Sequence, residues 1–236
     1  MYKNLAWTMN TIRMITVLMM VLVPFTGTAQ VQQRPVNLLI LGGIHGSWLN
    51  PDETMPAGGR ARMGLSAGLR MDYNFHPHFS LSWGVGILQA GGSVIYSDGL
   101  YADLDSGPVF LQRGATVTYR TQLMETTAAL KLQTNRIGYT RFFLEAGLDP
   151  LFRLKNTINA SNPELKKEPY TEGTPWFNLA YHTAIGFRYS FTRLLGFQAS
   201  IFYRNSFLDF TNRSPLQPAD LIRLNQAGIS LALTLL

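Results

Sequence analysis

The segment from Met63 to Phe75 alternates with a period of two. Large or apolar residues occupy every second position, and glycine, small polar residues and charges of both signs lie between them. This period is typical of a β-strand with one apolar and one polar face. At about 13 residues, the segment is longer than most soluble strands and suits a tilted crossing of a bilayer. Because Arg70 and Asp72 share the polar face and the apolar face carries no charge, the segment predicts a strand of a membrane barrel.

The same alternation recurs along the chain and predicts about eight strands. They lie at about 37–49, 63–75, 79–87, 116–132, 142–154, 177–189, 195–204 and 227–235. Short turns follow residues 75, 132 and 191, and longer polar connections follow residues 50, 93, 155 and 205. Bacterial outer-membrane barrels alternate short periplasmic turns with longer external loops in this way. We therefore predict an all-β protein, an eight-stranded antiparallel up-and-down transmembrane β-barrel in the cell outer membrane.

The first 29 residues have the pattern of an export signal. Lys3 and Arg13 supply positive charge, Met14–Phe25 is an apolar run, and Gly27–Ala29 offers small residues to signal peptidase. The apolar run is too short for a spanning helix, which needs about 20 residues. We expect residues 1–29 to be a cleaved signal peptide and residues 30–236 to form the barrel domain.

The composition favours a lipid-facing exterior. Charged residues make up 14% of the chain, whereas ordinary soluble domains have roughly 25%. A soluble lipocalin-type barrel would place its apolar residues inside, and so few charges would not coat its outer surface. The chain has no cysteine, which excludes disulfides and thiolate chemistry. The net charge of +6 is scattered without a basic run, so we expect no nucleic-acid partner.

Several segments resemble the PorT-type outer-membrane barrels of Bacteroidota-like bacteria. Met124–Leu132 (METTAALKL) and Lys131–Tyr139 resemble a strand and the turn that follows it, Phe143–Gly147 resembles the next strand, and Leu41–Gly43 and Gly64–Asp72 are similar too. The resemblance implies an eight-stranded outer-membrane barrel, and some relatives serve type IX secretion and gliding. Thr127 replaces the family's usual proline. Leu235 and Leu236 replace its terminal aromatic residue, which bears on recognition by the barrel-insertion machinery.

The polar faces of the expected strands carry charges of both signs. These inward charges are Arg70, Asp72, Glu125, Lys131, Glu145, Asp149, Arg153, Arg188 and Arg204. Side chains fill the lumen of an eight-stranded barrel, and buried charges must be paired. We predict a salt-bridge network in which Glu125 and Glu145 meet Lys131, Arg188 or Arg70. An ion path through the same residues, as in a small porin, is the alternative.

Candidate catalytic and metal-binding residues are sparse. His45 and Ser47 share the inward face of the first strand near its outer end, and Asp52 lies close by, as a rim enzyme would require. No spacing motif links them, and a separation of two residues on one strand arises easily by coincidence. His76 and His78 flank a proline in a turn without a third ligand nearby. We expect no catalytic, metal or cofactor site.

The connection from residue 93 to residue 114 mixes apolar and acidic residues. Its candidate partner-docking residues are Ile95, Tyr96, Leu100, Tyr101 and Phe110. An apolar surface on a hairpin above the membrane would suit a protein partner. The function expected is a non-enzymatic structural or interaction module, and the resemblance to PorT-type barrels implies an accessory of a type IX-like secretion or envelope assembly. Its expected partners are the bilayer, lipopolysaccharide, the barrel-insertion machinery and an envelope protein.

Overall fold

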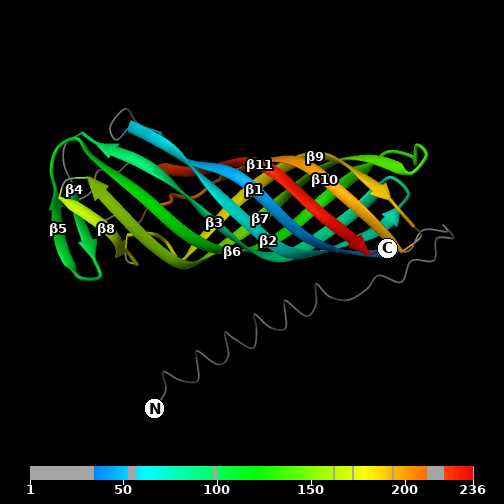
Figure 1. Ribbon diagram of the computed structural model, residues 1–236, viewed down its shortest axis with the longest axis horizontal. Helices are drawn as coiled ribbons and strands as arrows, with labels where there is room; N and C mark the ends of the chain where they lie inside the picture. The colour runs from blue at the N-terminus through cyan, green and yellow to red at the C-terminus, as the bar shows by residue number, and fades with distance from the viewer. Residues whose placement is uncertain are drawn as a thin grey trace, which may run out of the picture. The chain divides into compact units, whose positions relative to one another are not determined.

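The computed structural model describes residues 35–52, 57–97, 100–161, 163–171, 173–192, 194–211 and 221–235. Its strands are β1 (Val36–Pro51), β2 (Ala57–His76), β3 (Phe79–Tyr96), β4 (Leu100–Leu104), β5 (Gly107–Leu111), β6 (Ala115–Gln133), β7 (Thr140–Ser161), β8 (Glu164–Pro169), β9 (Phe177–Ser190), β10 (Leu195–Ser206) and β11 (Ile222–Leu235) (Figure 1). The predicted signal peptide lies outside the described residues. No helix among the described residues is long and apolar enough to cross a membrane.

Eight of these strands close into a barrel. Their hydrogen-bonded order is β6, β3, β2, β1, β11, β10, β9 and β7, and β7 pairs back with β6. All these pairings are antiparallel, and β1 pairs with β11 to join the first strand of the ring to the last. Two insertions add to the ring: β4 pairs with β5 as a separate two-stranded sheet, and β8 pairs with the end of β7. The predicted eight-stranded antiparallel up-and-down barrel is confirmed.

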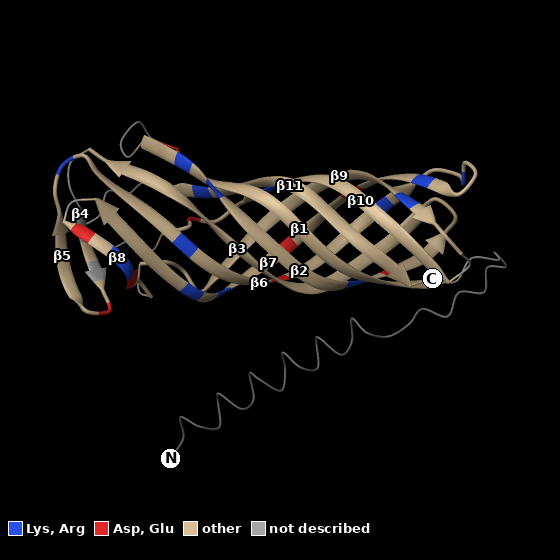
Figure 2. Ribbon diagram, viewed as in Figure 1, with Lys and Arg blue, Asp and Glu red and all other residues tan. Residues whose placement is uncertain are grey.

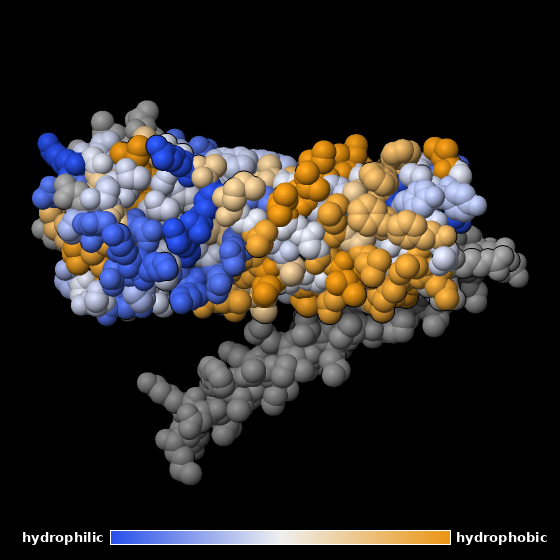
Figure 3. Space-filling model, viewed as in Figure 1, coloured by the Kyte–Doolittle hydropathy of each residue, from blue (hydrophilic) through white to orange (hydrophobic). Residues whose placement is uncertain are grey.

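An apolar belt surrounds the half of the barrel nearest the short turns. Leu69, Ile185 and Ile201 point outward from three strands and are 60%, 62% and 64% exposed. Figure 3 shows hydrophobic residues gathered over that half on the face in view. On the alternate positions, Asp72 and Lys131 are completely buried in the lumen. Over this part of the barrel, the predicted faces of the strands are confirmed.

Beyond the belt, the same strands reverse their sidedness. Val94, Val117 and Ile158 point inward and form part of a buried apolar cluster. Lys155 and Lys166 of the same region are exposed, and Figure 2 shows Lys and Arg positions along its strands. We call this part, with β4, β5 and β8, the outer extension. It has the arrangement of a water-exposed β-barrel, with apolar residues inside and charges outside. The barrel therefore changes solvent along its own axis.

Two regions predicted as polar connections are largely strands. β3 continues to Tyr96 and β6 begins at Ala115, with the β4–β5 hairpin between them. β7 continues to Ser161, and β8 then returns along it. The outward positions of these segments face water and carry polar residues, so a search for an apolar outward face reads them as loops.

A β-bulge also shifts the alternation on β7. Leu123 pairs with Arg153 and Gln122 pairs with Lys155, which leaves Leu154 as an extra residue. Odd-numbered residues point inward before the bulge and even-numbered residues point inward after it, as the burial of Leu151 and Ile158 shows. A bulge of this kind inserts one residue and re-aims the side chains that follow it.

The reversal of sidedness predicts unequal responses to an arginine introduced on the outward surface of the belt and of the outer extension. Leu69→Arg places a charge in the middle of the belt and should lower the free energy of unfolding in lipid by about 2–4 kcal/mol. Thr118→Arg, on the outward face of β6 in the outer extension, should change it by less than about 1 kcal/mol. Urea unfolding from phospholipid vesicles measures both values. Equal effects of the two variants would contradict the assignment of the belt.

Candidate functional site

The lumen of the belt half contains a connected set of buried charges. Arg70, Lys131, Arg188 and Arg204 supply the cations, and Asp72, Glu125, Glu145 and Asp149 supply the anions. They come from β2, β6, β7, β9 and β10, and each lies on the inward face of its strand. Four formal positive charges therefore meet four negative ones, so these eight groups have no net formal charge.

Asp72 and Lys131 form the part of this network nearest the short turns. The Lys131 Nζ lies 2.7 Å from Asp72 Oδ2 and 3.3 Å from Glu145 Oε2. Arg188 also pairs with Asp72 and donates to Gln198 Oε1 at 3.0 Å. Ser82 Oγ donates to the other carboxylate oxygen of Asp72 at 2.7 Å. Both oxygens of this fully buried carboxylate are therefore satisfied, as burial of a charge requires.

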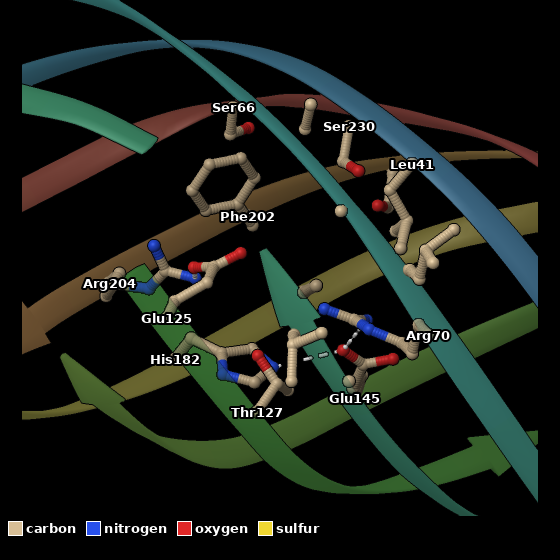
Figure 4. A pocket seen from close by; sticks show the side chains of 17 residues that line it. Leu41, Ser66, Arg70, Glu125, Thr127, Glu145, His182, Phe202, Arg204 and Ser230 are labelled. Carbon is tan, nitrogen blue, oxygen red and sulfur yellow. Dashed lines mark hydrogen bonds and ion pairs between the residues drawn. The ribbon is translucent and has the colours of Figure 1, made fainter. Parts of the chain in front are cut away.

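His182 connects the ion pairs around Lys131 and Glu145 to those around Asp149 and Arg204. Its Nε2 lies 3.0 Å from Glu145 Oε1 and its Nδ1 lies 2.9 Å from Asp149 Oδ2. A neutral imidazole can donate from only one nitrogen, whereas the imidazolium donates from both. The position of His182 between two carboxylates therefore favours its charged form. Figure 4 shows its ring between Glu145 and the Glu125–Arg204 pair.

Arg204 completes the network toward the outer extension. Its Nε lies 2.6 Å from Asp149 Oδ2, its Nη2 lies 2.6 Å from Glu125 Oε2, and its Nη1 donates to Gln226 Oε1 at 3.0 Å. Arg70 pairs with Glu145 at 2.6 Å from the opposite side of the lumen. The cavity left between these groups has a volume of about 50 Å³, which is room for a few water molecules and for no larger solute.

An apolar core fills the lumen on the side of the charges that faces the outer extension. Tyr119 is 1% exposed, and its ring lies 6.2 Å from that of Tyr170 and 5.8 Å from that of Phe210, between centroids. Its hydroxyl lies 2.8 Å from the hydroxyl of Tyr96. Aromatic rings of this size fill space that water would otherwise occupy, and each buried hydroxyl here has a partner. The described part of the lumen is thus filled by ion pairs at one level and by apolar packing at the next.

Two of the predicted lumen charges differ from the prediction, Glu125 in its partner and Arg153 in its position. Glu125 pairs with Arg204, and not with the three bases predicted for it, because Arg204 projects into the lumen from β10 at the level of Glu125. Arg153 lies outside the network: its Nη1 donates to Thr174 O at 2.5 Å and also to the carbonyl of Thr171. Arg153 is next to the bulge on β7, and its side chain binds the segment that follows β8 in the outer extension.

The predicted docking residues also divide. Tyr96 is 6% exposed and points into the apolar core, so the prediction that it forms part of a docking surface is wrong; even-numbered residues of β3 face inward along its whole length. Ile95 and Phe110 are 36% and 48% exposed. The side chains of Leu100 and Tyr101 lie outside the described part of the structure.

His45 and Ser47 bond to the barrel wall. The pairing of β2 with β3 lapses between Ala61 and Ser66. Across this gap, His45 Nε2 donates to Gln89 O at 2.9 Å, and Ser47 Oγ donates to Gly91 O at 2.8 Å and accepts from its N–H at 3.0 Å. These two side chains of β1 thus replace the missing bonds of the ladder, with His45 1% exposed and Ser47 fully buried.

Gly64 makes this bridge possible. A Cβ atom at Gly64 would lie 2.0 Å from Gln89 O and 2.7 Å from His45 Nε2. Only glycine leaves room for the side chain of β1 to reach past β2 to β3.

The fold and its filled lumen define an outer-membrane β-barrel. Residues 28–164 match the family described as outer membrane protein beta-barrel domain. The chain belongs to this family, and the protein lies in the outer membrane with its apolar belt in the bilayer.

Solved structures of several bacterial barrels are similar to this chain at low identity. Ail of Yersinia pestis is 10% identical over 85% of this chain and 99% of its own, with a TM-score of 0.41. Neisserial surface protein A is 10% identical over 83% and 95%, with a TM-score of 0.46. The outer membrane protease OmpT of Escherichia coli is 10% identical over 89% and 99%, with a TM-score of 0.41. No curated protein matches the chain.

The burial of the ion pairs predicts how much each one matters to stability. Lys131→Met leaves Asp72 and Glu145 without their buried ammonium partner and should lower the free energy of unfolding by about 3–5 kcal/mol. Lys166→Met removes the Lys166–Glu164 pair, which has the same 2.7 Å separation but side chains that are 77% and 70% exposed. That change should cost at most about 1 kcal/mol. Urea unfolding in vesicles distinguishes the two, and equal costs would show that the network does not hold the barrel together.

Proposed function

We propose that the protein is a non-enzymatic, non-conducting outer-membrane barrel whose outer extension docks a partner protein. The observation that carries the proposal is the filled lumen: the ion pairs from Asp72 to Glu125 and the apolar core around Tyr119 occupy its described cross-section. Because the lumen of such a barrel is filled, its function depends on its exposed surfaces. Its resemblance to PorT-type barrels supports a role as an accessory of a type IX-like secretion or envelope assembly.

The outer extension offers an ordered surface for such a partner. The β4–β5 hairpin carries the half-exposed Phe110, and Ile95 lies on the outward face of β3 close in sequence. Asp105, in the turn of this hairpin, connects it to the end of β8: its N–H donates to Pro169 O at 3.4 Å, and its carboxylate accepts from Thr171 N at 3.0 Å and Thr171 Oγ1 at 2.9 Å. These bonds hold the β4–β5 hairpin to the end of the β7–β8 hairpin.

Two other functions have less support. A small porin needs a continuous polar passage, whereas the cavity of about 50 Å³ lies among paired charges of both signs. A rim enzyme needs a free histidine and nucleophile, whereas His45 and Ser47 are bonded to the backbone of β3. For these reasons we propose a barrel without catalytic or channel activity, inserted by the barrel-insertion machinery and surrounded by lipopolysaccharide.

The docking proposal predicts a partner that depends on the hairpin. Affinity purification from native outer membranes should recover a specific envelope protein with the wild-type chain, and Phe110→Asp should reduce its yield at least about fivefold, because a charge on the contact surface must be desolvated on binding. Leu208→Asp is the matched control, since Leu208 is 44% exposed in a different connection. Recovery that is equal for all three chains, or single-channel currents from the pure protein in planar bilayers, would overturn the proposal.

The Asp105 contact predicts a pH dependence of the hairpin. The backbone N–H and then the hydroxyl of Thr171 hold the pKa of the Asp105 carboxyl below its usual 3.8. A lowered pKa means that the contact stabilises the hairpin fully above pH 3.8 and is lost as the pH falls through the lower value of the folded state. Hydrogen exchange of β4 and β5, corrected for the intrinsic rate, should accelerate in that acid range. The Asp105→Asn variant should exchange faster at neutral pH and show no such transition.

A further inference from the structure

The wall of the barrel has two irregularities at one level, on strands that are close neighbours. The β2–β3 ladder lapses just before Ser66, which pairs with Leu88. On the next strand Leu88 pairs with Leu123, whose partner Arg153 adjoins the bulge at Leu154. Both irregularities therefore occur where the apolar belt ends and the outer extension begins, and between them the outward surface is hollowed.

The part of this surface nearer the belt is an apolar hollow of about 350 Å³. Leu65 and Ala67 of β2, Ile87 of β3 and Leu154 of β7 line it from the outward face. Leu65, Ile87 and Leu154 are 60%, 59% and 58% exposed. The hollow also reaches the inward-facing Leu88, so it is deeper than the usual spacing between side chains on a flat sheet. Its size and lining suit a segment of hydrocarbon chain.

A second hollow of about 330 Å³ adjoins the first on its outer side. Gln89 and Gln122 line both hollows. The second hollow carries four cations from four strands: Arg62 of β2, Arg120 of β6, Lys155 of β7 and Lys167 of β8. We call it the cationic groove.

None of the groove cations has an acidic partner among the described residues, whereas two other external cations do. Arg223 pairs with Asp52, and Lys166 pairs with Glu164. By contrast, no carboxylate of the described residues forms a salt bridge with any of the four groove cations. The positive charges of Arg62 and Arg120 repel each other. The Arg120 Nε is a buried donor without a partner among the described residues. Such a concentration of positive charge is suited to an anion.

The backbone of β8 is strained where it supplies one of these cations. Lys167 has a φ of 55°, in the left-handed region that residues other than glycine seldom adopt. Its N–H donates to Asn159 Oδ1 at 2.8 Å, which holds the strand in this conformation. Strain of this kind persists where the surrounding structure requires it, and it is frequent at binding sites.

We propose that the apolar hollow and the cationic groove together bind one phosphorylated glycolipid of the outer leaflet. One acyl chain occupies the apolar hollow, and a phosphate of the sugar head group binds Arg62, Arg120 and the two lysines. Guanidinium groups bind phosphate through paired, charge-assisted hydrogen bonds. The two hollows follow each other along the membrane normal, as the chains and head group of a lipid do. A soluble phosphate would use the groove alone, and an uncharged lipid would use the apolar hollow alone.

The test measures lipid A bound to the purified protein in phosphatidylcholine nanodiscs by native mass spectrometry. The wild-type chain should retain one lipid A per protein. Arg62→Gln combined with Arg120→Gln should weaken retention at least about tenfold, because both guanidinium contacts with the phosphate are lost. Ala67→Phe, which fills the apolar hollow, should weaken it as well, and lipid A without phosphates should bind as poorly to wild type as lipid A does to the double variant.

Matched controls separate this site from general charge effects. Arg113→Gln combined with Lys166→Gln removes the same charge outside the groove and should leave retention unchanged. Inorganic phosphate should not displace lipid A, and phosphatidylglycerol should bind without a fixed stoichiometry. The proposal is overturned by equal loss in both double variants, by undiminished binding of dephosphorylated lipid A, or by phosphatidylglycerol bound as tightly as lipid A. None of these results depends on whether the β4–β5 hairpin docks a protein.

Discussion

The structure depends on the requirement that every strand of the belt presents hydrocarbon-compatible side chains outward. Because side chains of a strand alternate, this requirement forces the remaining positions into a lumen too narrow for bulk water. Charges there are retained only if each finds an opposite charge. The ion pairs satisfy that condition: they run from Arg188 through Asp72 and Lys131 to Glu145, and His182 connects Glu145 to Asp149 and Arg204. The ion pairs are therefore a consequence of the lipid-facing surface, and they close the lumen as they form.

The belt half could be predicted from the sequence because one rule governs it. In that half the apolar face is continuous and uncharged, so the alternation of Met63–Phe75 identified both the strand and its inward residues. The identity of the charged residues was also legible. Their pairing was legible only in part. Glu145 meets Arg70 and Lys131 as predicted, whereas Glu125 meets Arg204 of β10, because pairing depends on which strands face each other across the lumen. His182 shares its inward face with Arg188 on β9, and this parity was the available signal for its bridging position.

The outer extension was harder to predict because a different rule applies there. Its outward residues face water, so segments such as 155–161 of β7 carry polar residues on the outward face and read as loop. The bulge at Leu154 also shifts the alternation, and no local sequence pattern marks it. Tyr96 was misplaced for a related reason: an aromatic residue in a presumed loop was taken as surface, whereas the strand continues and buries it. Predictions of this kind fail where a strand passes from one solvent to another.

The reversal of sidedness between the belt and the outer extension has a consequence for biogenesis. The chain reaches the outer membrane from the periplasm, and the guanidinium and ammonium groups outside the extension, including Arg62, Arg120 and Lys155, end on the opposite side of the bilayer. Moving each of them through the hydrocarbon interior is costly. The outer half must therefore cross while those groups are shielded from acyl chains, by an assembly factor or a locally thinned membrane, before the belt settles in place.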